Sequence, residues 1–132
     1  MVAVKVNTGN RYDFYALEQS GKCEIIDFLR ELERVNKREF EKLVRDFDWT
    51  SKNGLIKNPE KFKPLGDNIY EFKTHGGVRV LCFLDGRCIV VLTNGFMKKK
   101  KYDSEIQRAI NLKVKYLTAK SLGFLTYREE SI

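Results

Sequence analysis

The amino-acid sequence predicts a small α+β fold, in which a helical hairpin packs on a mainly antiparallel sheet and a terminal helix follows. Three apolar runs bounded by turn sequences lie between residues 69 and 92, which indicates a meander of three strands. Two segments before this meander and one segment after it repeat apolar residues at helical spacing. The 132 residues suffice for one hydrophobic core but not for two, so we expect a single domain over residues 1–132.

The first half of the chain predicts one strand and two helices. Residues 1–10 are expected to be an extended lead-in or a frayed terminus, whereas the aromatic-rich residues 11–18 predict a strand. Apolar residues recur at helical spacing over residues 23–35, so one face of this helix should pack on the sheet. Asn36 and Glu39 have the spacing of a helix-capping pair and predict the start of a second helix.

The second half predicts the sheet and the last helix. Residues 49–64 are polar and contain both prolines, which favours a loop, and residues 65–68 form a turn sequence. The strands of the meander are predicted at residues 69–74, 78–84 and 88–92, the last two central and covered because they are almost wholly apolar. Good N-cap residues, Asp103 and Ser104, precede helical spacing up to about residue 118. Residues 121–132 are expected to be a final strand, a turn or a partner contact, flexible or peripheral like residues 1–10.

The charge of the chain favours an anionic partner. Lys and Arg number 25 against 18 acidic residues, which gives a net charge of +7. The acids concentrate in residues 18–48 and the lysines thicken after Lys57, so one half of the chain is strongly basic. Many small basic proteins bind no nucleic acid, so charge alone leaves the partner open.

Cysteine usage and hydropathy predict a cytoplasmic protein. Cys23, Cys82 and Cys88 have no paired spacing, and we expect them to be buried thiols in a reducing compartment. The N-terminal residues lack a long apolar core, and no apolar run approaches the length of a membrane span.

Several cations stand where they could hold a phosphate. RNA cleavage by internal attack needs a base, cations that hold the charged phosphate and an acid for the leaving oxygen. Lys73 and Arg79 lie on adjacent predicted strands, Lys98–Lys101 follow the last strand, and Tyr102 and His75 lie nearby. A cation within a covered strand costs several kcal/mol unless it is paired or binds an anion, so Arg79 requires an explanation.

The hairpin between these strands has two possible geometries. If residues 75–77 form a three-residue loop with a left-handed glycine, Lys73 faces Arg79 on one side of the sheet. If Gly76 and Gly77 form a two-residue loop, Thr74 opposes Arg79 instead. The sequence leaves both open.

Each of these residues also has a structural explanation. Arg79 could form a structural ion pair with Glu71, and the lysine run could be a solvated surface without a partner. His75 could be a turn residue without a catalytic role, and Tyr102 could serve only to pack the start of the last helix. Zinc hydrolysis, Ser or Cys nucleophiles and phosphate-binding glycine loops lack the residues they need. We therefore expect no metal and no cofactor.

Three motifs carry a family resemblance: LGDNIYEFK at residues 65–73, GVRVL at residues 77–81 and NGFMKK at residues 94–99. Together with the order of the predicted elements, they resemble the RelE/ParE toxin superfamily, and most closely its HigB-like, phage-derived branch. The similarity spans residues 12–117. The resemblance implies a small α/β toxin that cleaves messenger RNA with the ribosome and is neutralised by a helix-turn-helix antitoxin.

The site residues are assigned from this resemblance and from the charge pattern. The candidates for catalysis are Lys73, Arg79, Lys98, Lys99 and Tyr102. The candidates for RNA binding are His75, Lys57, Lys61, Lys100 and Lys101.

Three other functions remain open at this point. ParE relatives share the fold but bind DNA gyrase without cleaving RNA. A phage-encoded module could use the cations only to bind RNA or protein. Residues 100–104 are shorter than in the family branch and lack its proline, which leaves an inert relative as the third possibility.

Overall fold

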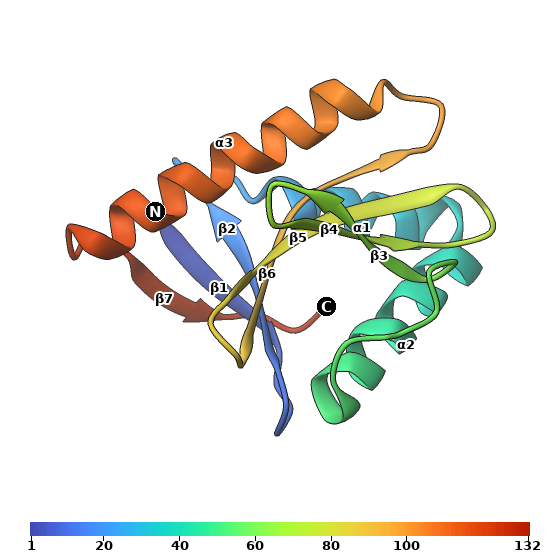
Figure 1. The fold of residues 1–132 in the computed structure, drawn as a ribbon, viewed down its shortest axis with the longest axis horizontal. Helices are drawn as coiled ribbons and strands as arrows, with labels where there is room; N and C mark the ends of the chain where they lie inside the picture. Colours follow the sequence, from blue (N-terminus) through green and yellow to red (C-terminus); the bar gives the residue numbers. More distant parts are fainter.

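The computed structural model describes residues 1–132 as three helices and one seven-stranded sheet. Figure 1 shows α1 and α2 against one face of the sheet and α3 across the other. The predicted fold class, a helical hairpin on a mainly antiparallel sheet with a terminal helix, is confirmed. The elements are β1 (Val2–Asn7), β2 (Asp13–Glu18), α1 (Glu24–Val35), α2 (Lys37–Asn53), β3 (Phe62–Gly66), β4 (Ile69–Lys73), β5 (Val78–Asp85), β6 (Ile89–Met97), α3 (Tyr102–Ser121) and β7 (Thr126–Glu129).

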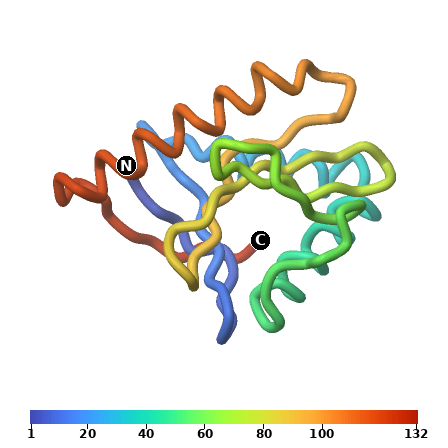
Figure 2. The backbone as a smooth tube through the Cα atoms, viewed as in Figure 1, coloured from blue at the N-terminus to red at the C-terminus, as the bar shows by residue number.

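The sheet has the strand order β3-β4-β5-β6-β2-β1-β7. Neighbouring strands are antiparallel except in two pairs, β2 with β6 and β1 with β7, which are parallel. The backbone trace in Figure 2 shows the first and last strands of the chain, β1 and β7, side by side at one edge of the sheet. Strands β5 and β6 are central and largely buried, as their apolar sequences predicted.

The N-terminal segment is an internal strand, so the expectation of a lead-in or a frayed terminus was wrong. Strand β1 pairs with β2 on one side and with β7 on the other. Its residues Ala3 and Val4 are completely buried, because each face of the sheet is covered by helices. Of the alternatives for the C-terminal tail, the final strand is correct: β7 forms one edge of the sheet and is exposed along its length.

Helix α2 begins as predicted but ends later. The side chain of Asn36 accepts a hydrogen bond from the Glu39 amide at 3.4 Å, which confirms the predicted cap. The helix continues to Asn53, into the segment predicted as a loop. The carbonyl of Ser51 accepts hydrogen bonds from the amides of Arg11 and Tyr12 at 2.9 and 3.1 Å, so tertiary contacts hold this last turn.

The other end of the predicted loop is strand β3, which pairs with β4 at the sheet edge. An edge strand tolerates Pro64 because one side of its backbone needs no partner. Phe62 anchors β3 to the core through its ring contact with Phe72 at a centroid distance of 4.7 Å. The predicted turn is confirmed, since Asp67 and Asn68 have positive φ angles of 55° and 60°, as a tight hairpin requires.

Helix α3 begins at Tyr102, one residue before the first of the two predicted cap residues. Lys101 occupies the cap position without a side-chain hydrogen bond, and Asp103 and Ser104 lie within the first turn. The helix start is fixed from the sheet instead: Nδ2 of Asn94 on β6 donates to the backbone and side-chain oxygens of Glu105, at 3.2 and 3.1 Å.

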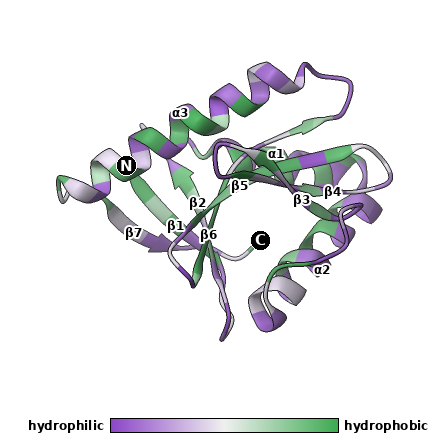
Figure 3. Cartoon of the chain, viewed as in Figure 1, coloured by the Kyte–Doolittle hydropathy of each residue, from purple (hydrophilic) through white to green (hydrophobic).

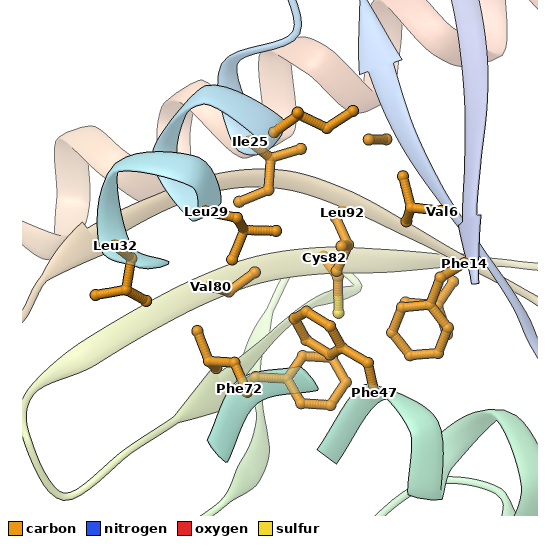
Figure 4. Close-up of a cluster of buried hydrophobic side chains, with 14 of the residues drawn as sticks. Val6, Phe14, Ile25, Leu29, Leu32, Phe47, Phe72, Val80, Cys82 and Leu92 are labelled. Atoms are coloured by element: carbon orange, nitrogen blue, oxygen red, sulfur yellow. The ribbon is translucent and has the colours of Figure 1, made fainter. Parts of the chain in front are cut away.

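Two hydrophobic clusters flank the sheet. A cluster of 19 buried residues lies between the sheet and α1 and α2, and ten of its members are labelled in Figure 4. A smaller cluster of 9 buried residues lies under α3. Figure 3 shows the apolar residues concentrated on the strands and the inner helix faces, while the loop from β6 to α3 is hydrophilic.

The cysteines are free thiols, and two of the three are buried as predicted, Cys23 and Cys82. Cys88 is exposed, because it belongs to the turn before β6 and not to the strand. None of the helices is both long and apolar enough to span a membrane.

Candidate functional site

The candidate site lies where the β4–β5 hairpin tip meets the loop from β6 to α3, at one end of the molecule (Figure 1). The amide of Lys98 donates to the carbonyl of Gly77 at 2.8 Å and joins the two segments. The lysine run therefore begins beside the hairpin tip, although about twenty residues separate them in the sequence.

The hairpin has the three-residue loop. Thr74 and Val78 close it through an amide-to-carbonyl bond of 3.1 Å, and Gly77 adopts a left-handed φ of 93°. Lys73 is consequently paired with Arg79 across the two strands. Side chains directly opposite each other project from the same face, so these two cations stand together.

The Arg79 guanidinium is held by neutral oxygens rather than by a carboxylate. Nη1 donates to the carbonyls of Thr74 and Val78 at 3.0 and 2.9 Å, and Nε donates to the Tyr102 hydroxyl at 2.7 Å. Arg79 is only 9% exposed and forms no ion pair, so the predicted alternative of a bridge to Glu71 is not present. Nη2 makes no hydrogen bond within the protein and is not enclosed, which leaves its donors available to an anion.

Tyr102 both packs and bonds. Its ring lies edge-on to Phe96 at a centroid distance of 5.2 Å, while its hydroxyl accepts the bond from Arg79. Burial raises the pKa of Tyr102, and the neighbouring Glu71 carboxylate raises it further, against the opposing effect of Arg79. The hydroxyl therefore stays protonated at neutral pH, as a proton donor must.

Glu71 is a site residue that the sequence predicted only as a partner of Arg79. Its side chain is 1% exposed, Oε1 lies 3.9 Å from the ammonium of Lys63, and Oε2 has no hydrogen-bond partner. A buried carboxylate is costly, and this one raises the pKa of the neighbouring Tyr102 hydroxyl. The strand alternation could have indicated it, because Glu71 shares the face of Lys73 two residues later.

The lysine run is exposed and carries no ion pair. Lys98 follows β6, and the aliphatic part of its side chain lies beside Gly77 at the hairpin tip. Lys99, Lys100 and Lys101 continue through the loop to α3 without a hydrogen bond from their ammonium groups. The structure thus places Lys98 against Gly77 at the hairpin tip and leaves the next three lysines on the loop surface.

The remaining candidates for RNA binding separate into two groups. His75 is exposed at the hairpin tip and lines a pocket together with Lys61. Lys57 lies in the exposed loop between α2 and β3, outside that pocket and without a side-chain contact to the site.

Glu39 fixes the hairpin tip from α2, and sequence reasoning recognised it only as part of a helix cap. Its Oε1 accepts a hydrogen bond from the Thr74 hydroxyl at 2.6 Å. Gly76 lies directly against the same carboxylate, where a Cβ atom would collide with it. Burial alone would raise the pKa of Glu39, but hydrogen bonds from Thr74, Lys42 and the Gly76 amide outweigh this effect and lower it.

The arrangement can bind and polarise a phosphodiester. Arg79, Lys73 and Lys98 supply positive charge from three segments, and the oxygens around Arg79 orient its guanidinium in advance. The protonated Tyr102 hydroxyl provides a proton donor in direct contact with this cation.

These features define a small α+β protein with a preorganised cationic site. The model of the family described as "Phage derived protein Gp49-like (DUF891)" matches residues 27–114, which is more than half of the chain. The protein therefore belongs to the phage-derived Gp49-like family. The matched segment includes the hairpin tip, the lysine run and Tyr102. The comparison with curated proteins gave no match.

Proposed function

We propose that this protein is the toxin of a type II toxin–antitoxin module and a ribosome-dependent mRNA endonuclease that needs no metal. The observation that carries the proposal is the Arg79 guanidinium, which is buried in the sheet and donates hydrogen bonds to three oxygens. Its Nη2 atom makes no hydrogen bond within the protein. Burying a cation without a carboxylate partner costs free energy, and an anion that binds to the cation offsets this cost. A phosphate accepts hydrogen bonds from Arg with good geometry.

In the proposed reaction, Arg79, Lys73 and Lys98 hold the scissile phosphate. The 2′-oxygen of the RNA attacks phosphorus, and the bond from phosphorus to the 5′-oxygen breaks. This leaves a cyclic phosphate on one product and a 5′-hydroxyl on the other. The 2′-hydroxyl proton passes to solvent while Lys99 or another lysine stabilises the developing negative charge, and Tyr102 donates the proton that the 5′-oxygen takes.

The biological setting of the proposal follows from family likeness. The Gp49-like family and the motifs that resemble the HigB-like branch of the RelE/ParE superfamily support a toxin that acts on mRNA. The same resemblance supports a helix-turn-helix antitoxin as the neutralising partner. Ribosomes and mRNA place this activity in the cytoplasm.

The test compares wild type with Arg79→Ala in cells, by mapping mRNA ends while translation is active and after it is blocked. We expect translation-dependent cuts with wild type and a loss on the order of 10²–10³-fold in Arg79→Ala, the effect of removing one preorganised charge donor. Lys98→Ala serves as a second variant, because the exposed Lys98 side chain is dispensable for folding and should lower cleavage by about tenfold.

The matched control is Lys115→Ala, which removes an exposed cation of α3 that forms no ion pair. Equal transcript integrity in wild type and Arg79→Ala, with both proteins folded, would refute the nuclease. If transcripts stay intact while purified protein inhibits DNA supercoiling, the protein is a gyrase-binding toxin instead.

A further inference from the structure

A polar pocket lies between α2 and the ends of β3 and β4, beside the hairpin tip. No apolar residue lines it, which makes it unsuitable for the apolar face of a partner helix. Its walls come from α2, from the residues before β3 and from the hairpin tip: Lys42, Arg45, Asp46, Glu60, Lys61, Lys73, Thr74 and His75.

Hydrogen bonds connect the segments that form the walls of the pocket. The hydroxyl of Thr74 is bonded to Glu39 of α2 at 2.6 Å, and the amide of Lys73 donates to the carbonyl of Lys61 at 2.8 Å. The three wall segments are therefore tied to one another by hydrogen bonds. A ligand would not have to order the backbone of these segments, so the main ordering cost on binding is that of the exposed Arg45 and Lys61 side chains.

The pocket carries an excess of cations that lack carboxylate partners. Lys42 is paired with Glu39 at 2.9 Å, but Arg45, Lys61 and Lys73 form no ion pair. The two carboxylates of the wall, Asp46 and Glu60, form none either.

Asp46 offsets these cations only in part. Burial raises the pKa of its carboxyl, while Lys61 and Arg45 counteract the rise. Unpaired cations that converge on a polar hollow are suited to an anion with several acceptor oxygens.

The pocket is continuous with the candidate site through the hairpin tip. Lys73, which lines the pocket, is paired across the strands with Arg79. The carbonyl of Thr74, another wall residue, accepts a bond from Arg79 at 3.0 Å, and Gly77 accepts one from the Lys98 amide. One RNA strand could therefore contact both Arg79 and the pocket.

We propose that this pocket binds a backbone phosphate that flanks the scissile phosphate in the same RNA strand. The proposal rests on the proposed function, because it assumes that RNA occupies the site at Arg79. Arg45 and Lys61 are the phosphate ligands, and Lys73 lies between the two phosphates. The pocket is a positioning site: it sets which stretch of RNA reaches Arg79 and takes no part in bond breaking.

The experiment measures binding of a single-stranded RNA oligonucleotide to the full chain by fluorescence anisotropy over a range of KCl concentrations. The variant is Arg45→Ala/Lys61→Ala, and both side chains are exposed, so the fold should persist. The control, Lys37→Ala/Lys115→Ala, removes the same charge from exposed positions outside the pocket. Circular dichroism melting verifies that all the proteins are folded.

We expect the pocket variant to bind about tenfold more weakly than the control. Its slope of log affinity against log salt should be smaller by about 0.7, the value for one phosphate contact on a single strand. Equal affinities and slopes in the two double variants would overturn the proposal. A selective loss of binding to an acidic peptide, with RNA binding unchanged, would overturn it in favour of a protein partner.

Cleavage on ribosomes is measured separately, so that the two proposals can fail independently. If wild type binds RNA through the pocket but never cleaves it, the nuclease is wrong and the phosphate pocket stands. If wild type cleaves and the two double variants bind alike, the pocket is wrong and the nuclease stands.

Discussion

The two faces of the sheet differ in the residues that they bury. The face under α1 and α2 is a continuous apolar core in which Phe14, Phe47 and Phe72 contact one another with ring centroids 5.0 to 6.0 Å apart. The face under α3 has a smaller apolar core and, at one end, the buried polar groups Arg79 and Glu71. The first face holds the larger apolar core and the second the candidate site at Arg79, so substitutions on the two faces should affect different measurements.

The largest expected effect is on the aromatic face. Phe72→Ala removes a fully buried ring that contacts three other phenylalanine rings, and it should lower the free energy of unfolding by about 3–5 kcal/mol. Phe124→Ala is the control, since Phe124 is 69% exposed and its loss should change stability by less than about 0.5 kcal/mol. Urea denaturation followed by circular dichroism measures both, and equal losses would contradict the division between the faces.

On the α3 face, Tyr102→Phe keeps the ring contact with Phe96 and removes only the hydroxyl that Arg79 bonds. We expect ribosome-dependent cleavage to fall by about 10²-fold, the usual size of general acid catalysis, with a melting temperature close to wild type. Tyr127→Phe is the matched control, because Tyr127 is largely exposed on the edge strand β7. A destabilised protein with a normal cleavage rate would make Tyr102 a packing residue.

A smaller effect should come from Glu39, which connects α2 to the hairpin tip. The pKa of Glu39 is lowered in the folded protein, so its contribution to stability is present above its unfolded pKa and is lost as the pH falls through the folded value. Glu39→Gln should therefore lower the free energy of unfolding by about 1–2 kcal/mol near neutral pH, and by much less in acid. Urea denaturation at two pH values tests this, and a pH-independent difference would contradict the assignment.

The smallest expected effect is that of Glu71 on the pKa of Tyr102. Burial and the Glu71 charge both raise the pKa of Tyr102, so Glu71→Gln should lower that pKa towards its ordinary value. The measurement is an NMR titration of the tyrosine rings, with Tyr127 as an internal reference. If the Tyr102 titration is unchanged, Glu71 does not tune the hydroxyl.

Local sequence patterns predicted those elements whose stability is mostly local. The apolar spacing of α1, the Asn36 cap of α2 and the turn at Asp67 and Asn68 were all predicted and are all present. Each depends on side chains a few residues apart, which the sequence displays directly.

The elements that were predicted wrongly depend on distant partners. Strand β1 looked like a weak terminal segment because its partners, β2 and β7, lie elsewhere in the chain. Strand β3 was hidden by Pro64, which an edge position tolerates. The last turn of α2 is held by the amides of Arg11 and Tyr12, far away in the sequence.

For the candidate site, the sequence by itself determined the kinds of group: a cation within an apolar strand, a lysine opposite or near it, a lysine run and a tyrosine before the last helix. Only the tertiary structure decided that the hairpin has a three-residue loop, that Tyr102 and not Glu71 bonds Arg79, and that Lys99–Lys101 stay on the loop surface. Composition and periodicity fix which chemistry is available, because they depend on residue type and local spacing. The direction of a side chain and its partner depend on register and on packing between segments far apart in the chain, which no local pattern encodes.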